Sequence, residues 1–207
     1  NALGQIKMIG VLMTNFCLGF FRGVPWDQIF GGAETFETAS SPYLKPESNA
    51  MSHPSVAGGG QIYTQISHVA AHLTFLTGQD PAEVFARFDN YDTSVDVYNT
   101  LNVKLDGGAL VSIASTGATM KTERNYEVRV YGTEGMLFME LWKGTMQFHT
   151  VDGQVRDYPN LPDDAIYPNA APTENLVDTV LGDAPNRSPA TLGYSAMKLI
   201  EAACKSA

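Results

Sequence analysis

Cysteine is nearly absent from this sequence. The 207 residues contain only Cys17 and Cys204, and nothing in their spacing pairs them. Two isolated thiols exclude a disulfide-stapled scaffold and are typical of proteins in a reducing compartment. We therefore expect a cytoplasmic protein in which both thiols are free.

Positive charge and long apolar runs are also scarce. The sequence has 13 Lys and Arg residues against 22 Asp and Glu, which gives a net charge of −9. Nucleic-acid binding needs clustered basic residues, and anionic membranes attract them, so we expect neither partner. The most apolar run, Met8 to Phe21, is interrupted by Thr14-Asn15 and is shorter than the ~20 residues of a membrane span. No basic segment precedes it, as a signal peptide would require.

A nucleotide-binding loop is missing too. Three glycines, Gly58 to Gly60, are followed by Gln61-Ile62, so neither the G-x-G-x-x-G spacing nor a GK[ST] motif is present. Glycines at such a position let the backbone approach a neighbour closely and can leave a helix N-terminus open to a polar ligand. The tract therefore predicts a close contact and no dinucleotide site.

Alternating apolar and polar residues fill the middle of the sequence. Between Ala82 and Tyr158, runs such as Leu101–Leu105 and Tyr126–Val130 place an apolar residue at every second position, and Asp106-Gly107 is a hairpin signal. Five or six such strands joined by short turns predict an antiparallel meander. Residues 4–15 predict one more strand at the start of the chain.

Residues 22–57 are irregular and rich in Pro, Gly and Ser. We expect a long ordered loop or lid, because Trp26, Phe30, Phe36 and Tyr43 are too apolar for a disordered linker. These aromatic side chains, Trp26 among them, could form a wall of a sugar pocket or anchor the loop on the core.

Three helices are expected around the strands. The first covers about residues 60–77 and ends at Gly78; the others are the segment TENLVDTVLGD, with Thr173 as N-cap and Gly182 as stop, and about residues 189–206. Strands followed by helices indicate an α+β fold, a largely antiparallel open sheet with helices packed on one face.

The helix expected at 60–77 has one apolar face and one polar, uncharged face. The polar face carries Gln61, Thr64, Gln65, His68 and His72. His68 and His72 are four residues apart, as in zinc helices, but there is no H-E-x-x-H motif and no obvious further ligand, so we expect no metal site. Uncharged hydrogen-bonding groups suit a polyol, but they could equally satisfy neighbouring backbone groups. Glu123-Arg124 and Glu127-Arg129 are expected to be solvated strand residues.

Four segments in order resemble the C-terminal domain of the Gfo/Idh/MocA oxidoreductases, the family of glucose–fructose oxidoreductase and inositol dehydrogenase. They are LGQIKMIG, GGGQIYTQISHVAAHLTFLTGQDPAEVFA, NYEVRVYGTEGML and ENLVDTVLGDAP…TLGYSAMKLIEAACKSA, and they cover nearly the whole chain. The resemblance implies that residues 1–207 are one substrate-binding and oligomerisation domain. The Rossmann domain that holds NAD or NADP in this family would lie outside this chain.

The resemblance also implies residue roles. His68 falls on the family's helix histidine beside the substrate and the nicotinamide, so it is the candidate catalytic residue, and Gln61, Tyr63, Thr64 and Gln65 would orient a small hydroxylated substrate. Thr64 departs from the family, because many members have an aspartate there. A threonine cannot act as a carboxylate in a proton relay. His68, or a residue outside this chain, would therefore have to take over that role.

Two functions remain open from the sequence. One is the substrate domain of an NAD(P)-dependent oxidoreductase that acts on a sugar, cyclitol or related polyol. The other is a non-enzymatic assembly or small-molecule-binding module. Because Tyr131, Phe138 and Trp142 fall among the outward positions of their strands, we also expect a dimer or tetramer that pairs through the uncovered face of the sheet.

Overall fold

The structure, a computed structural model, describes residues 2–25, 28–29, 50–120 and 123–207. The described residues form one eight-stranded sheet. Its strands are β1 (Ile6–Thr14), β2 (Pro81–Asp89), β3 (Tyr98–Leu105), β4 (Leu110–Thr116), β5 (Asn125–Gly132), β6 (Gly135–Glu140), β7 (Thr145–Thr150) and β8 (Val155–Asp157). The predicted loop aromatics Trp26, Phe30, Phe36 and Tyr43 lie outside the described residues.

The sheet is a meander with one strand inserted into it. The strand order is β2-β3-β4-β1-β5-β6-β7-β8, so the first strand of the chain separates β4 from β5. β1 pairs in parallel with β4, with Val11 opposite Ile113, and antiparallel with β5, with Val11 opposite Val128. All other pairs are antiparallel. The predicted α+β class with a largely antiparallel open sheet is confirmed.

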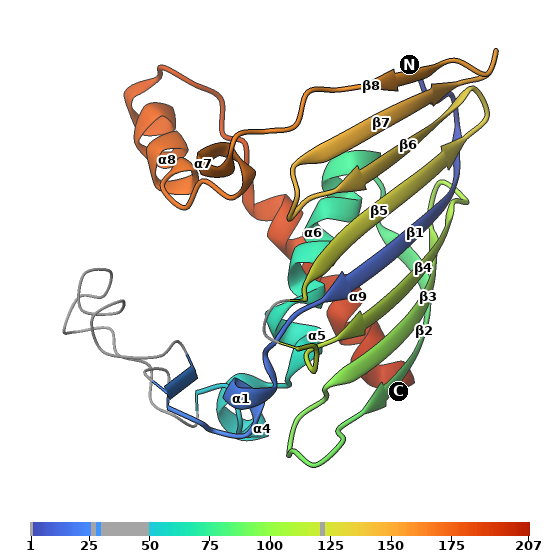
Figure 1. Cartoon of the computed structure of the whole chain (residues 1–207). Helices are drawn as coiled ribbons and strands as arrows, with labels where there is room; N and C mark the ends of the chain where they lie inside the picture. Colours follow the sequence, from blue (N-terminus) through green and yellow to red (C-terminus); the bar gives the residue numbers. More distant parts are fainter. Residues whose placement is uncertain (1, 26–27, 30–49, 121–122) are drawn as a thin grey trace.

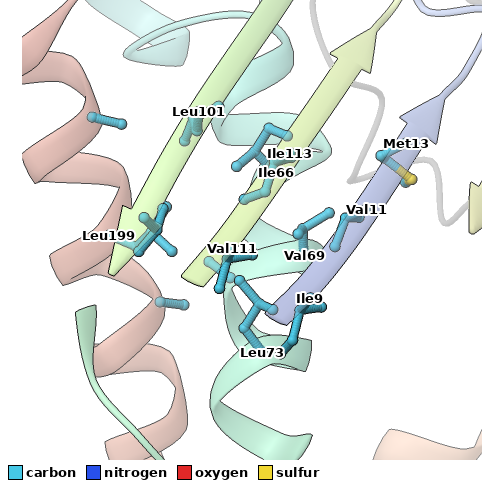
Figure 2. Packing of buried hydrophobic residues seen from close by; sticks show 14 of the residues in the cluster. Ile9, Val11, Met13, Ile66, Val69, Leu73, Leu101, Val111, Ile113 and Leu199 are labelled. Carbon is cyan, nitrogen blue, oxygen red and sulfur yellow. The ribbon is translucent and has the colours of Figure 1, made fainter. Parts of the chain in front are cut away.

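Two helices, α6 (Ile66–Thr77) and α9 (Ala190–Ser206), cover one face of this sheet (Figure 1). Between them and the strands lies the main core. Figure 2 shows its packing, with Ile66, Val69 and Leu73 of α6 against Ile9 and Val11 of β1. The helix and strand periods predicted from the sequence account for this layer, because the residues that alternate in the strands and recur on the helix face are the buried ones.

The remaining described helices are short or peripheral. They are α1 (Leu18–Phe21), α4 (Pro54–Ala57), α5 (Gln61–Thr64), α7 (Asp163–Ile166) and α8 (Ala171–Leu181). The helix predicted at 60–77 is divided at Gln65 into α5 and α6, and it ends as predicted at Gly78, whose φ is 66°. Thr173 was the wrong N-cap for the next helix, because α8 begins two residues earlier, after Ala170; its predicted stop at Gly182 is confirmed.

The opposite face of the sheet carries no helix in the part of the chain that the structure describes (Figure 1). Its outward residues include Phe85, Met8 and Leu110, which are 53%, 47% and 58% exposed. Tyr131 and Phe138 lie on this face, as predicted, with ring centroids 5.8 Å apart. Trp142 does not. β6 ends at Glu140, so the alternation stops there, and Trp142 packs from the following turn against the helix-side core.

Both cysteines are free thiols: Cys17 is buried and Cys204 is exposed. Burial raises the pKa of Cys17 to about 12, which keeps this thiol protonated at neutral pH. Across the described residues, no helix is both long and apolar enough to cross a membrane.

Candidate active site

The glycine tract before α5 holds a carboxylate of the chain itself. Asp96, which is only 6% exposed, accepts hydrogen bonds from the backbone N–H of Gly60 and of Ile62, each at 2.7 Å, and from Nδ2 of Asn99 at 2.8 Å. Its backbone carbonyl accepts the N–H of Gln61 at 2.9 Å. The first donors of the helix are therefore satisfied internally, and this turn is not open to a ligand.

The close approach explains the glycines. A Cβ at Gly60 would overlap the carbonyl oxygen of Asp96, and one at Gly59 would lie 2.8 Å from Cδ2 of Tyr63. The Tyr63 ring packs on this backbone, and burial raises its pKa. Tyr63 therefore lies against the glycine tract and not beside His68.

Gln61 lies in the core. Its side chain is fully buried, Nε2 donates to Oγ of Ser115 at 2.8 Å, and Oε1 faces Gly117 with no hydrogen-bond partner among the described residues. A substrate-binding role was predicted for Gln61, but the structure exposes no atom of this side chain to a ligand.

His68 lines a cavity of about 250 Å³ where the end of β1 meets the start of β5. The lining comes from five parts of the chain. These residues are Met13, Asn15, Gln65, His68, Arg124, Tyr126, Leu141, Trp142, Ile166 and Tyr167. Polar groups and aromatic rings together form the kind of surface that holds a small hydroxylated molecule.

The two histidines of α6 have different surroundings. His72 Nδ1 lies 3.2 Å from the hydroxyl of Tyr126, and the two rings meet edge to face. His68 as a whole residue is accessible to solvent, although protein atoms surround part of its ring, and no described residue bonds to that ring. Protein atoms around both rings lower the pKa of each by desolvation, so His68 is neutral at pH 7. His68 therefore offers the cavity a neutral imidazole that is free to accept or donate a proton.

Of the other predicted site residues, Gln65 reaches the cavity and Thr64 does not line it. Gln65 Oε1 accepts a weak hydrogen bond of 3.4 Å from Nδ2 of Asn15. Thr64 Oγ1 donates to the carbonyl of Gly60 at 2.9 Å, one turn back along the helix. Trp26 lies outside the described residues.

The sequence reasoning missed Asn15, Arg124, Trp142 and Tyr167 as cavity residues. The Arg124 guanidinium lies 4.4 Å from the centroid of the Trp142 ring, and Tyr167 packs on the same indole at 5.2 Å. No motif marks these residues, because only the insertion of β1 beside β5 and the return of the chain at α7 bring them together. In the described part of the chain, no group of three or more His, Cys, Asp or Glu residues could hold a metal ion.

Several solved structures share this fold. UDP-N-acetylglucosamine 3-dehydrogenase GnnA from Acidithiobacillus ferrooxidans is 13% identical with a TM-score of 0.69, over 98% of this chain and 54% of its own. Levoglucosan dehydrogenase in complex with NADH is 14% identical with a TM-score of 0.71, over 99% of this chain and 57% of its own. GenD2 from gentamicin A biosynthesis in complex with NAD is 17% identical with a TM-score of 0.69, over 99% of this chain and 54% of its own.

At these identities the likeness establishes the fold. The chain spans just over half the length of the structures it matches. No curated protein sequence matches it significantly. The family model for the GFO/IDH/MocA C-terminal domain matches residues 29–138, which is more than half of the chain, and the sheet and helices agree with it. The chain therefore belongs to the GFO/IDH/MocA C-terminal domain family of oxidoreductases.

Proposed function

We propose that this chain is the substrate-binding and oligomerisation domain of an NAD(P)-dependent oxidoreductase that acts on a sugar, cyclitol or related polyol. The observation that carries the proposal is His68, a neutral imidazole with no partner among the residues that the structure describes, in a cavity lined in part by amides and aromatic rings. The sequence resemblance assigns the family's helix histidine to the same residue.

The cavity suits a sugar-sized ligand and not a whole dinucleotide. Its volume of about 250 Å³ lies just below the ~300–1,000 Å³ of sites for drug-sized molecules. The chain has no glycine fingerprint, and its glycine tract already holds Asp96. We therefore assign the adenosine and pyrophosphate of the cofactor to a part of the protein outside this chain. The reacting end of the substrate would bind beside His68.

In this reaction the bound nicotinamide supplies the chemistry of hydride acceptance. The chain's own residues would accept the proton that leaves the hydroxyl group. As the hydroxyl-bearing carbon loses a hydride, its oxygen must lose a proton, and an unprotonated ring nitrogen of His68 can accept it while the carbonyl forms. Gln65 and Asn15 would orient the neighbouring hydroxyls. Thr64 cannot replace the carboxylate that many family members have at this position.

The test is NAD(P)H formation by the full-length protein on a panel of sugars, sugar acids and cyclitols. We expect turnover of at least one of them and loss of turnover in His68→Ala. The isolated chain should bind neither NAD nor NADP in calorimetry. Micromolar binding to the chain alone would contradict the division of roles between domains.

The uncovered face of the sheet supports the oligomerisation role. Met8, Phe85 and Leu110 line a shallow groove on it, and the Phe138 ring packs at an angle against Tyr131 and His149 beside Arg129. Exposed apolar residues mixed with polar ones are typical of an interface, and a two-fold pair is the commonest closed assembly. We propose a dimer or tetramer that buries at least ~1,000 Å² per interface.

Light scattering at tens of micromolar tests the assembly. We expect at least twice the mass of one subunit, and conversion to monomer in a Phe85→Glu, Leu110→Glu double variant. Both side chains are exposed, so the fold should tolerate the change. A wild-type monomer would contradict the proposal.

A further inference from the structure

The cavity beside His68 has an unusual charge for this chain. The protein carries a net charge of −9, yet among the described residues no carboxylate lines the cavity, and Arg124 is the one charged residue of its described lining. The lowered pKa of His68 leaves that imidazole neutral, so it contributes no charge of its own at pH 7. A ligand in this cavity therefore meets a single positive group among neutral donors, acceptors and aromatic rings.

Arg124 is positioned without being neutralised. Its guanidinium lies over the Trp142 ring at 4.4 Å from the centroid, and the Tyr167 ring packs on the same indole with its centroid 5.2 Å away. Arg22 and Arg129, by contrast, form ion pairs with Asp92 and Glu127. Within the described residues, Arg124 has no ion pair or hydrogen bond. Stacking restricts the plane of the guanidinium and leaves its N–H donors available.

We propose that Arg124 recognises an anionic group, a carboxylate or a phosphoryl group, on the hydroxylated substrate. A stacked guanidinium can donate two parallel hydrogen bonds to either group, and the charge makes these bonds stronger than neutral ones. The reacting hydroxyl lies at His68 and the anion at Arg124, so the substrate is a sugar acid or sugar phosphate and not a neutral polyol. This inference rests on the proposed function, because it describes the substrate of the same cavity.

The experiment uses the full-length protein and three probes that differ at one position: D-glucose, D-glucuronate and D-glucose 6-phosphate. Calorimetry measures binding of each in the presence of NADH. We expect at least one anionic probe to bind about tenfold or more tightly than glucose, the scale of one charge-assisted contact. Which of the two binds distinguishes a carboxylate from a phosphoryl site.

Two arginine variants locate the effect. Arg124→Gln should abolish the preference for the anion and leave NADH binding unchanged. Arg87→Gln is the matched control, because the Arg87 guanidinium lies at the same 4.4 Å from the Phe85 ring, on β2 and away from the cavity. Its preference should equal that of the wild type.

Equal responses to the three probes, absence of binding included, overturn the inference. So does a loss of NADH affinity in Arg124→Gln with the anion preference retained, which would assign the guanidinium to the cofactor. These outcomes are separate from a failure of the proposed function. Turnover of neutral polyols alone would contradict the anion site and leave the oxidoreductase function standing. Anion binding without any NAD(P)-linked turnover would contradict the oxidoreductase function and leave the anion site standing.

Discussion

Two successive turns of one helical segment behave in opposite ways. At the glycine tract and α5, Asp96 satisfies the backbone donors and the fit is tight enough to exclude a Cβ at Gly60. One turn later, His68 faces a cavity with no partner from the described chain. A turn whose backbone donors are satisfied by the chain holds the fold together, whereas a turn that presents an unpartnered imidazole to a cavity is available for chemistry.

The largest effect should come from removing the carboxylate that closes the first turn. Asp96→Ala leaves buried backbone donors and the Asn99 amide without an acceptor, which should lower the free energy of unfolding by about 3–5 kcal/mol. Urea unfolding measures this. Asp92→Ala is the control, because its carboxylate is exposed and its loss should change little. Equal stability of the two variants would refute the structural role of Asp96.

Next in size is the effect of the second turn on activity. In the full-length enzyme, His68→Ala should lower kcat/KM by roughly 10²-fold or more, the usual scale for an acid–base group, while its Tm stays near that of the wild type. His72→Ala is the matched variant four residues away. It should lose stability through the Tyr126 contact but keep its activity per folded molecule. A reversal of these two results would exchange the roles of the histidines.

A smaller loss of stability should follow from filling the close contact. Gly60→Ala forces a Cβ into the carbonyl of Asp96, and overpacking of this kind costs about 1–3 kcal/mol. Gly10→Ala, on the open face of the sheet, adds a Cβ that meets no atom within 4 Å. Thermal unfolding of the pair compares a tight site with an open one, and a Gly60→Ala protein as stable as Gly10→Ala contradicts the close contact.

The pH dependence should be the mildest effect. Only neutral His68 can accept a proton, and desolvation lowers its pKa below the ordinary 6.5. We therefore expect kcat/KM to be level above pH 6.5 and to fall as pH drops through that lowered pKa. The free energy of unfolding should also fall as the pH drops. The folded chain lowers the pKa of His68 and of His72, so the unfolded chain binds protons at these two residues more readily. A kcat/KM that begins to fall well above pH 6.5 would show that His68 is not the group being titrated.

Much of the fold followed from the sequence, because burial imposes a period on the residues. The strands of Tyr98–Leu105 and Asn125–Gly132 and the end of α6 at Gly78 were predicted from alternation and from a stop residue. The position of β1 was not, because pairing between distant strands leaves no local pattern. Trp142 was misplaced for a related reason: alternation predicts a side only while the strand continues.

The site was predicted only in part. The helix periodicity placed Gln65 and His68 on one polar surface and left open whether that surface meets a ligand. The family resemblance implied a substrate there, and this stays a prediction. The same periodicity grouped Gln61 with them, although a slight break at Gln65 separates α5 from α6 and Gln61 turns into the core beside Ser115. Arg124 and Tyr167 come from remote segments. Their proximity depends on tertiary contacts, so neither period nor motif could reveal it.

The insertion of β1 also has a consequence for how the chain folds. Ile9 of β1 pairs with Val111 on one side and Val130 on the other. Both partner strands come about 100 residues or more after β1 in the sequence. Such non-local pairing slows folding, because the intervening segment must lose conformational entropy before any contact between the distant strands stabilises the chain. The two parts of the meander, β2–β4 and β5–β8, can each form from neighbours. We expect that the two parts join around β1 late in folding, and that the same step completes the cavity.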